Sequence, residues 1–527
     1  MASRRWPKRP LEAVEPLLTA AEAYPALERA TLAAQRRVWL WFRLFDPGMR
    51  LADPEVRAAV GETWSDLIAH RLAAGVEVAL AVSDFDPAAR PGLHAQAWRA
   101  VRLLTPLVPQ GLALLVADHA ARPGLLWRLP GKLAAALKIE KLRRAMNAGE
   151  SPWTLDDLPA LQGPLGAEAA RVVWRSAATP PLKPGTHHQK VAVFDEDRAI
   201  LGGLDVNPRR WDEPEHRRPA DETWRDLSVV VSGPIATDAA AHLARLWNDA
   251  ARRSGGDGPP PLEPPPAAPD TVKDGPRLRL SATVSGLTED PRDLGPKVRE
   301  RDLEADHLAL IRSAQRFLYI ETQFFRSRRI ARALARRGAR NPDLGLILVL
   351  PAAPDDVAFE RADGLDARFG EWLQGHCVRR VLRAFRERAA VLSPARAAPR
   401  SAEDRSALGG AGIVYVHTKT IIADDEAAIV SSANLNGRSL RWDTEAGVLI
   451  RSSEVAGGVR RRLSETLLPE DAPAKAFAAD AAAPGLWAGI AARNAGRAPA
   501  RRDGLLMPFP LRRTEDFGQP APAAPEE

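Results

Sequence analysis

Cysteine is nearly absent from this sequence, since Cys377 is the single one among 527 residues. One thiol excludes an internal disulfide framework and a cysteine-based zinc site. Long apolar runs are also lacking. Candidates such as Leu344–Leu350 are strand-sized, whereas a membrane-spanning helix needs roughly 18 or more apolar residues. We expect Cys377 to be a small core residue of a helix around Trp372–Phe385 rather than a reactive thiol.

The start of the chain lacks the apolar core of a secretory signal, because the basic residues MASRRWPKRP run directly into Pro and Glu. We therefore expect a soluble protein that is cytoplasmic or peripheral to the membrane. Secretion by a non-Sec route stays open.

Lysine is scarce, with ten among the 74 basic residues. A lysine at a chemically suggestive position is therefore informative. The net charge of +7 favours anionic partners such as phosphate esters, nucleic acid or an acidic membrane surface. An ordinary basic surface explains the same number equally well.

Composition divides the chain into two halves, a linker and a tail. The content of 45% hydrophobic and 27% charged residues is typical of globular domains. The stretch Ser254–Asp270 is too rich in Pro and Gly for a helix or a central strand. We predict an N-terminal half over residues 1–253, a linker over 254–275, a C-terminal half over 276–467, and a partly disordered Ala/Pro/Arg-rich tail over 468–527.

Helical and strand patterns alternate in the same order in both halves, which predicts α/β units. The expected helices are Pro16–Arg36 and Pro54–Ala74 in the first half, and Leu303–Ser313 and Arg328–Arg337 in the second. The expected strands are Val38–Phe42, Val76–Val82, Phe317–Ile320 and Leu344–Leu350. We predict duplicated halves, each with a mixed, mostly parallel sheet flanked by helices.

Each half contains the same short motif. His188-Gln189-Lys190 is followed after four residues by Asp195, and His417-Thr418-Lys419 by Asp424 at identical spacing. Two such motifs arise by chance in roughly one chain in ten thousand. Apolar residues and a polar turn surround both, which predicts a β-hairpin whose first strand carries His and Lys on one face. For Asp195 and Asp424, a role in the turn and a role supporting the motif are equally expected.

Small and polar residues follow each motif at the same offset, as Gly202–Asn207 and Ser431–Asn434. They would let the backbone approach a bound anion closely. An acid then starts an apolar strand in each half, Asp226 before Leu227–Val231 and Glu445 before Ala446–Ile450. An imidazole that presents one nitrogen to a substrate is usually held by a carboxylate at the other.

These residue types suit chemistry at phosphorus. One neutral histidine can attack and form a phosphohistidine, while a second, protonated one gives its proton to the leaving alcohol. Two lysines can neutralise the non-bridging oxygens. No divalent ion or other cofactor is required, so we expect none.

At this point the chain resembles the phospholipase D superfamily in its two-motif, single-chain form. The surrounding segments are similar too: Gly202–Asp212, Trp224–Asn248, Tyr319–Phe325 and Asn434–Val448. The resemblance covers about residues 30–465. It departs from the family pattern at Ser431-Ser432, at Asp205 and at Thr322, which leaves the head group and the acceptor open.

The resemblance implies αβαβα-type halves related by a pseudo-twofold axis, with one active site at their interface. It makes His188 the nucleophile and His417 the general acid, oriented across the interface by Glu445 and Asp226 respectively. With Lys190, Lys419 and the motif aspartates, these form the expected catalytic set. The candidate substrate-binding residues are Asp205, Asn207, Asn434, Gln323 and Ser432.

We expect a phosphodiesterase that hydrolyses glycerophospholipid head groups to phosphatidic acid, or exchanges them with an alcohol. The alternatives are a cardiolipin synthase-like transferase, a nuclease of the same superfamily, and an inactive scaffold, against which the complete motifs argue. The expected partners are a phospholipid and, transiently, a membrane surface, with nucleic acid not expected and a monomer sufficient.

Two further segments have competing interpretations. His187 adjoins the first motif, but strand alternation favours a structural role on the opposite face. The apolar loop Leu125–Lys132 and the basic helix Leu133–Met146 could dock on an anionic bilayer. We favour an ordinary amphipathic helix packed on the body of the protein.

Overall fold

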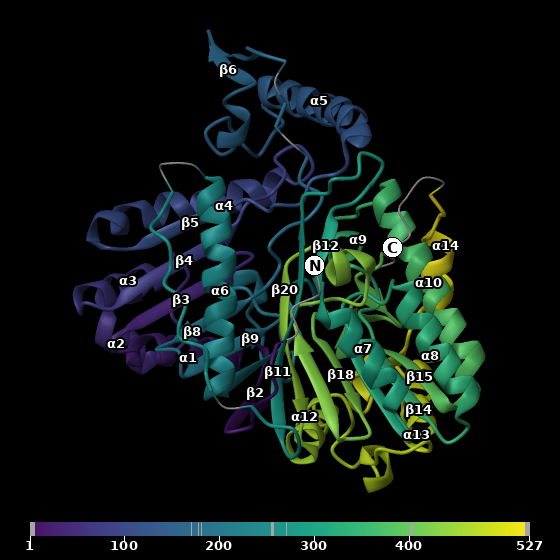
Figure 1. Ribbon diagram of the computed structural model, residues 1–527. Coiled ribbons are helices and arrows are strands. Elements are labelled where there is room, and N and C mark those ends of the chain that lie inside the picture. Colours follow the sequence, from purple (N-terminus) through teal and green to yellow (C-terminus); the bar gives the residue numbers. More distant parts are fainter. Residues whose placement is uncertain are drawn as a thin grey trace.

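Two β-sheets lie side by side in the protein, each covered by helices (Figure 1). The computed structural model describes residues 6–169, 171–177, 179–180, 182–254, 258–269, 271–400 and 404–521. Parts of the predicted linker, 255–257 and 270, and the last residues of the predicted tail, 522–527, lie outside the described residues.

The N-terminal sheet has seven strands in the order β2-β10-β9-β8-β3-β4-β5. In chain order their bounds are β2 Ala13–Leu18, β3 Arg37–Phe42, β4 Glu77–Ser83, β5 Ala113–Ala117, β8 Val191–Phe194, β9 Arg198–Gly202 and β10 Leu227–Ser232. A separate hairpin is formed by β6 Leu165–Glu168 and β7 Arg171–Trp174.

The C-terminal sheet has twelve strands. Seven of them follow the order β11-β20-β19-β18-β13-β14-β15, and their bounds are β11 Arg277–Gly286, β13 Phe317–Thr322, β14 Gly345–Val349, β15 Ala389–Pro399, β18 Lys419–Ala423, β19 Ala427–Ser431 and β20 Glu445–Arg451. The others lie at its edges: β1 Arg9–Pro10, β12 Lys297–Arg301, β16 Ala407–Leu408, β17 Ala411–Ile413 and β21 Leu506–Pro508.

The two seven-strand paths match strand for strand. In each, the first four pairings are antiparallel and the last two are parallel. The topology thus repeats, as expected for two similar halves. The sheets are mixed but not mostly parallel, because each motif hairpin and the strand after it add antiparallel pairs at the centre of the sheet.

Helices cover the outer faces of the sheets and fill the space between them. In the N-terminal half they are α1 Thr19–Ala33, α2 Pro54–Val60, α3 Trp64–Ala73, α4 Pro91–Leu104, α5 Leu125–Ala148 and α6 Pro234–Arg253. In the C-terminal half they are α7 Asp302–Ser313, α8 Arg328–Arg340, α9 Asp355–Phe359, α10 Leu365–Phe385, α11 Gly437–Arg441, α12 Ser453–Glu465, α13 Ala483–Ala495 and α14 Leu511–Phe517.

The predicted helices Pro16–Arg36 and Pro54–Ala74 both differ from the structure. The first three residues of the first prediction, 16–18, belong to edge strand β2 instead, and α1 begins only at Thr19. The second prediction is divided into α2 and α3 because Gly61 has φ 121° and Thr63 starts a new helix with a capping box.

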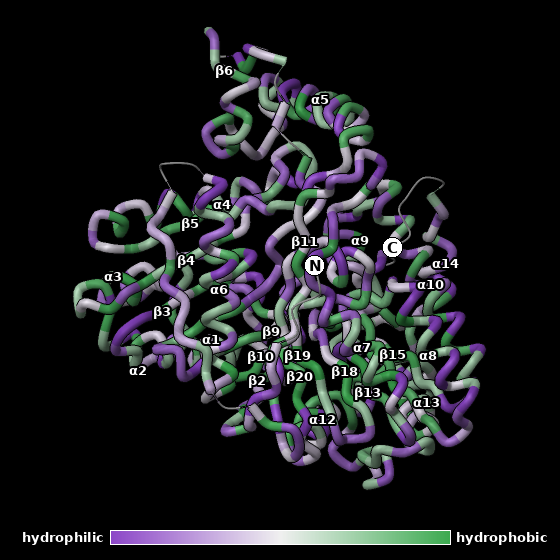
Figure 2. Tube along the Cα trace, in the orientation of Figure 1, coloured by the Kyte–Doolittle hydropathy of each residue, from purple (hydrophilic) through white to green (hydrophobic). Residues whose placement is uncertain are grey.

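A shared core joins the two halves. Apolar side chains from β3 and β10 of one sheet and from β13 and β20 of the other belong to one buried cluster, together with α6, α12 and α13. Separate clusters pack α1 and α3 on the outer face of the first sheet, and α7, α8 and α10 on the outer face of the second. The strands are the most hydrophobic segments of the trace (Figure 2).

The tail is more ordered than predicted. Within the described residues to 521 it contains α13, β21 and α14, and β21 pairs with β15 of the C-terminal sheet. Trp487 of α13 is fully buried. The described residues of the Pro-rich linker form no helix or strand but are anchored, since Asn248 of α6 exchanges two hydrogen bonds of 2.8 Å with the backbone of Leu262. Among the described residues, no helix is both long and apolar enough to cross a membrane.

A buried ion pair ties the halves together beneath their interface. Arg225, just before β10, donates to both carboxylate oxygens of Glu321 on β13 at 3.1 and 2.9 Å, and both side chains are fully buried. Arg225 also donates to Thr466 Oγ1 at 2.6 Å and to the carbonyl of Leu463 at 2.9 Å. All three nitrogen atoms of the Arg225 guanidinium therefore donate hydrogen bonds to residues of the other half.

We predict that Arg225→Met destabilises the protein by about 3–5 kcal/mol, because it leaves the Glu321 carboxylate buried without its counter-charge. Urea denaturation followed by circular dichroism measures the change. The double variant Arg225→Met/Glu321→Met removes both charges and should regain at least half of the loss. A double variant no more stable than the single one would contradict this account.

Candidate active site

The backbones of the two motif histidines are each held by the opposite half. The amide of His188 donates to the carbonyl of Thr444 at 2.8 Å, and the amide of His417 donates to the carbonyl of Arg225 at 2.7 Å. Thr444 and Arg225 are the residues directly before the acids Glu445 and Asp226. Each segment that holds a histidine backbone therefore also supplies a carboxylate one residue later.

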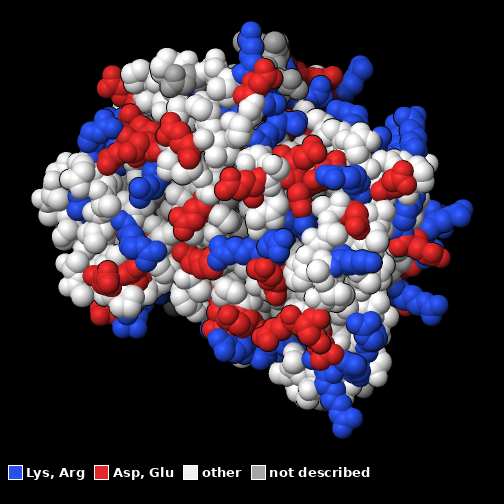
Figure 3. All heavy atoms as spheres, turned by 90° about the horizontal axis from the view of Figure 1, so that it is seen from below, with Lys and Arg blue, Asp and Glu red and all other residues white. Residues whose placement is uncertain are grey.

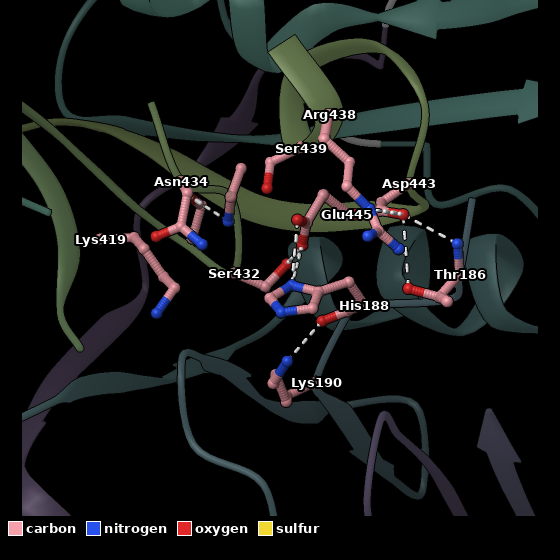
Figure 4. Close-up of polar contacts among 12 residues, drawn as sticks. Thr186, His188, Lys190, Lys419, Ser432, Asn434, Arg438, Ser439, Asp443 and Glu445 are labelled. Carbon is pink, nitrogen blue, oxygen red and sulfur yellow. Dashed lines mark hydrogen bonds and ion pairs between the residues drawn. The ribbon is translucent and has the colours of Figure 1, made fainter. Parts of the chain in front are cut away.

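Both carboxylates contact the Nδ1 atom of the histidine that crosses to them. His188 Nδ1 lies 3.0 Å from Glu445 Oε2 (Figure 4), and His417 Nδ1 lies 2.6 Å from Asp226 Oδ2. All four side chains are buried. With Nδ1 occupied, Nε2 is the nitrogen of each ring that can act on a substrate. The pairings implied by the family resemblance are thus present.

Each motif lysine donates a hydrogen bond to the backbone of the histidine in its own motif. Lys190 Nζ donates to the carbonyl of His188 at 2.6 Å, and Lys419 Nζ donates to the carbonyl of His417. Lys190 also lies 3.7 Å from a carboxylate oxygen of Asp205. Both lysines are 2% exposed, so their charges are held inside the site rather than dispersed in water.

Burial shifts the protonation of the whole cluster. It lowers the pKa of His188 and of His417 well below the usual value, and the positive charge of the nearest lysine lowers each further. Burial raises the pKa of Asp226 to about 7 and that of Glu445 to about 8. It also lowers the pKa of Lys419 to about 7. Burial thereby favours the uncharged form of each of these groups.

The charges of the two motifs act on one another across the interface. Lys419 lowers the pKa of His188, whereas Lys190 and His188 lower that of His417. These mutual effects require both motifs to share one site. The arrangement can present two imidazoles and two ammonium groups to a single phosphate.

Aromatic side chains support the histidine rings on both sides of the site. The ring of Trp224 packs against that of His417, with centroids 4.4 Å apart and the planes tilted by 36°. On the other side His187 lies between Trp41 and His119, at 4.9 and 4.6 Å. His187 is buried away from the substrate-facing atoms, as the alternation predicts. His119 Nε2 lies 2.9 Å from Thr444 Oγ1 and so supports the segment that carries Glu445.

Ser432 occupies a different position from the one predicted. Its hydroxyl donates to Glu445 and thus orients that carboxylate instead of facing a substrate. The equivalent residue of the first half is Gly203, where an added Cβ would lie 2.1 Å from Asp226 Oδ1. One half holds its acid with a hydroxyl, and the other makes room for its acid with a glycine.

The other candidate substrate-binding residues fall into two groups. Asp205 and Asn434 are equivalent and line the site: Asp205 faces Lys190, and Asn434 lies near Lys419 and donates to Gln323 at 3.1 Å (Figure 4). Gln323 in turn donates to Tyr415 at 2.7 Å. Asn207 is structural, since its side chain accepts from the amide of Arg209 and starts a short helix. Its predicted role in substrate binding is not supported by this position.

The motif aspartates lie outside the site, at the far ends of the hairpin strands. Seven residues of extended chain separate Asp195 from His188, which is roughly 20 Å. Its carboxylate accepts from the backbone amides of residues 35–37, and that of Asp424 accepts from residues 315–317. Both begin turns with two residues at positive φ, 50° and 68° in the first and 56° and 57° in the second. Their assignment to the catalytic set is corrected to a structural one.

Two arginines were missed by the sequence analysis. Arg43 directly follows β3, and its charge acts on His188 and Lys190; Arg210 acts on His417 and Asp226. Within the described residues, the Nε atoms of both are buried without a hydrogen-bond partner. The signal for Arg43 was available, because it is a charged residue placed at the end of the apolar strand VWLWF.

Comparison with known proteins agrees with this geometry. The sequence family described as "Cardiolipin synthase, PLD-like domain" matches residues 308–467. Phospholipase D2 of Bos taurus is 26% identical over 359 residues, which cover 51% of this chain and 38% of the relative. Cardiolipin synthase A of Pseudomonas putida (strain GB-1) is 25% identical over 280 residues, which cover 53% and 47%. These matches support placing the chain in the phospholipase D superfamily.

A solved structure of another protein has a similar fold. The crystal structure of phosphatidylserine synthase from Haemophilus influenzae Rd KW20 matches with a TM-score of 0.50 at 14% identity, covering 87% of this chain and 88% of that one. Its likeness concerns the fold alone. The matched part spans less than half the length of the curated relatives named above.

We predict that Gly203→Ala lowers the rate of phosphodiester cleavage at least about 100-fold, because the new methyl group displaces the Asp226 carboxylate from His417. Steady-state kinetics with a soluble diester measures it. The control is Gly458→Ala, where an added Cβ meets nothing within 4 Å. Unchanged kinetics in the Gly203 variant would refute the close approach.

Proposed function

We propose that this protein cleaves the phosphodiester bond of glycerophospholipids and transfers the phosphatidyl group to water or an alcohol through a phosphohistidine. The observation that carries the proposal is the pair of crossed histidine–carboxylate contacts, 3.0 and 2.6 Å long, with a buried lysine beside each histidine. Lipid head groups are favoured as substrates because relatives named phospholipase D and cardiolipin synthase are 26% and 25% identical to this chain over 51% and 53% of its length.

In the first step, Nε2 of His188 attacks phosphorus and forms a P–N bond as the bond to the head-group oxygen breaks. The leaving alkoxide takes a proton from Nε2 of His417. In the second step, His417 removes a proton from water, whose oxygen attacks phosphorus, and the P–N bond breaks to release phosphatidic acid. Lys190 and Lys419 stabilise the charge on the non-bridging oxygens throughout.

The pKa shifts of the two histidines fit this sequence of events. A nucleophilic imidazole has to be neutral, and burial lowers the pKa of His188 accordingly. A bound phosphodiester contributes a negative charge beside the two lysines. It therefore raises the pKa of the adjacent His417 and favours the protonated form that the leaving group needs.

A transferase is the second candidate. The family description that matches residues 308–467 is that of a cardiolipin synthase domain, which favours the hydroxyl group of a second lipid as the acceptor. The two candidates share the first step and differ only in the acceptor. Product analysis with and without phosphatidylglycerol as acceptor separates them.

We predict that the wild-type protein releases the head group from phosphatidylcholine or phosphatidylethanolamine, and that His188→Ala and His417→Ala each lose at least about 10³-fold in rate because the two histidines act as one unit. A panel with these lipids, bis-p-nitrophenyl phosphate and plasmid DNA measures the preference. The solvent-exposed side chain at His70 provides a His70→Ala control. Cleavage of DNA without cleavage of lipid would replace the proposal by a nuclease.

The covalent step has its own test. Rapid acid-free quenching with a substrate radiolabelled at phosphorus should trap the label on His188 in the His417→Ala variant, where breakdown of the intermediate is slowed more than its formation. If the label were instead found on His417 in a His188→Ala variant, His417 would be the nucleophile and His188 the general acid.

We predict that kcat/KM falls as the pH rises above about 7. Lys419, whose pKa burial lowers to about 7, carries its charge below that value and loses it above. A lysine without charge cannot neutralise the phosphate oxygens. The variant Lys419→Arg keeps its charge at all accessible pH, so it should move the alkaline limb upward even if kcat is lower. The exposed Lys297→Arg is the control, and an alkaline limb identical in both variants would contradict the assignment.

A further inference from the structure

Helix α5 presents a stripe of leucines to the solvent. Leu125, Leu129, Leu133 and Leu137 follow one another at intervals of four residues and are 66%, 77%, 66% and 67% exposed. Side chains at this spacing lie along one face of a helix. Leu126, beside the first of them, is 62% exposed. A continuous apolar surface of this kind is rare on a soluble protein that has no partner there.

The inward side of α5 is apolar as well. Ile139 and Ala135 are buried, and Ile139 packs with Leu158, Leu161 and Leu165 in a small separate core. The helix is therefore already anchored without its leucine stripe. The prediction of an amphipathic helix packed on the body of the protein therefore accounts for the inward side of α5 but not for its exposed leucines. The predicted loop Leu125–Lys132 is itself helical.

Basic residues flank the stripe. The helix carries six cations and one acid, Glu140, which is paired with Arg143 and Arg144 at 2.8 and 2.7 Å. Lys132, Lys138 and Lys141 are exposed and form no ion pair within the described part of the chain. The three ammonium groups are thus available to an anionic surface that contacts the leucines.

The helix rises from the edge of the sheet that holds the active site. Strand β8 is antiparallel to β3 and pairs Val191 with Trp41, so the start of β8 next to Lys190 lies at the carboxyl end of β3. Strand β5 is parallel to β4 and β3, so its end at Ala117 reaches the same edge. His119, which contacts Thr444, and then α5 follow within eight residues.

The start of α5 is fixed to the C-terminal half. The amides of Gly124 and Leu126 donate to the carbonyls of Asp293 and Pro291 at 2.8 and 3.0 Å, and Trp127 Nε1 donates to that of Arg292 at 2.9 Å. The helix projects from one end of the molecule (Figure 1). On the opposite face, seen from below, acidic and basic residues are interspersed (Figure 3), which is typical of a solvated surface.

We propose that the outward face of α5 docks on an anionic lipid bilayer, with the leucine stripe entering the acyl boundary and Lys132, Lys138 and Lys141 contacting acidic head groups. The arrangement matches that of an interfacial helix, with leucines on one face and lysines along its borders. The inference rests on the proposed function, because it brings the site edge toward a lipid substrate. It names the surface that performs the docking and the lipid charge it prefers.

Vesicle cosedimentation tests the inference in the His188→Ala background, so that the lipid is not consumed. Vesicles of phosphatidylglycerol and phosphatidylcholine in equal parts should bind the protein well, and pure phosphatidylcholine vesicles weakly. The variant Leu129→Ser/Leu133→Ser/Leu137→Ser should partition at least about tenfold less into the mixed vesicles. The variant Lys132→Glu/Lys138→Glu/Lys141→Glu should lose a similar factor at low salt, and less at 1 M salt.

Matched controls separate docking from general surface properties. Leu365 begins α10 and is 74% exposed, so Leu365→Ser removes an equally exposed leucine elsewhere. Arg332→Glu/Arg336→Glu/Arg340→Glu reverses three exposed charges on α8, a helix of the C-terminal half with no acidic residue. Both controls should bind vesicles within about twofold of the parent. Loss of binding in the α8 variant but not in the α5 variants would overturn the inference.

A probe locates the helix directly. Cys377 is fully buried, so a polarity-sensitive dye can be attached selectively to a Leu129→Cys variant. Its emission should shift to the blue on addition of anionic vesicles, whereas the same dye on a Leu365→Cys variant should not respond. No shift at position 129 in protein that cosediments with vesicles would overturn the inference.

Further measurements keep the failure of docking distinct from the failure of the proposed function. Hydrolysis of bis-p-nitrophenyl phosphate and of detergent-dispersed lipid should be unchanged when the α5 substitutions are made in the protein with His188 intact. Activity on these substrates without vesicle binding by the parent would overturn docking alone. Vesicle binding through α5 without any lipid cleavage would overturn the proposed function alone. Sedimentation velocity identifies the remaining occupant, since a dimer that the triple serine variant dissociates would assign the stripe to a second copy and overturn docking.

Discussion

Reciprocal support between the halves is the constraint on which the site depends. Each half supplies a histidine whose backbone and ring are both held by two consecutive residues of the other half, Thr444-Glu445 for His188 and Arg225-Asp226 for His417. Neither imidazole is therefore oriented until both halves have folded and met. The same segment secures the interface, because Arg225 places its guanidinium on Glu321 in the other half while its neighbour holds the catalytic ring. Assembly of the fold and assembly of the site are one event.

The repeated topology also allows equivalent positions of the two halves to be compared. Strand order and direction agree over seven strands. Each motif aspartate accepts hydrogen bonds from three backbone amides at the start of the neighbouring strand, β3 for Asp195 and β13 for Asp424. The differences lie around the acids. Gly203 leaves space for Asp226, whereas Ser432 donates to Glu445. A hydroxyl bond stabilises the ionised carboxylate that receives it, so the two histidines do not face equivalent partners. Such asymmetry is what a nucleophile and a general acid require.

Sequence reasoning identified the histidines, the lysines and both acids because these depend on a repeated pattern that the chain itself displays. It failed where position depends on tertiary packing. Asp195 belongs to the motif by spacing, yet strand β8 carries it to the far end of the hairpin. Asn207 lies among motif residues but caps a short helix. The buried tail residue Trp487 was hidden by an Ala- and Pro-rich composition that resembles disorder, because a few large apolar side chains in a helix are enough to dock it on a sheet edge. The sequence pattern predicted the helix over Leu133–Met146 but neither the first turns of α5, where a loop was expected, nor the direction of its apolar face.

Burial disfavours the charged forms of the ionisable groups in this site. Two lysines, two carboxylates and Arg43 lie around the histidines, and desolvation opposes the ionisation of each. The Nε atoms of the nearby Arg43 and Arg210 are buried without a hydrogen-bond partner among the described residues. In the proposed reaction, the negative charge of a phosphodiester would favour the charged forms of the two lysines. This stabilisation would be greatest for the species with the most charge on its non-bridging oxygens, which along the proposed pathway is the pentacoordinate transition state rather than the substrate.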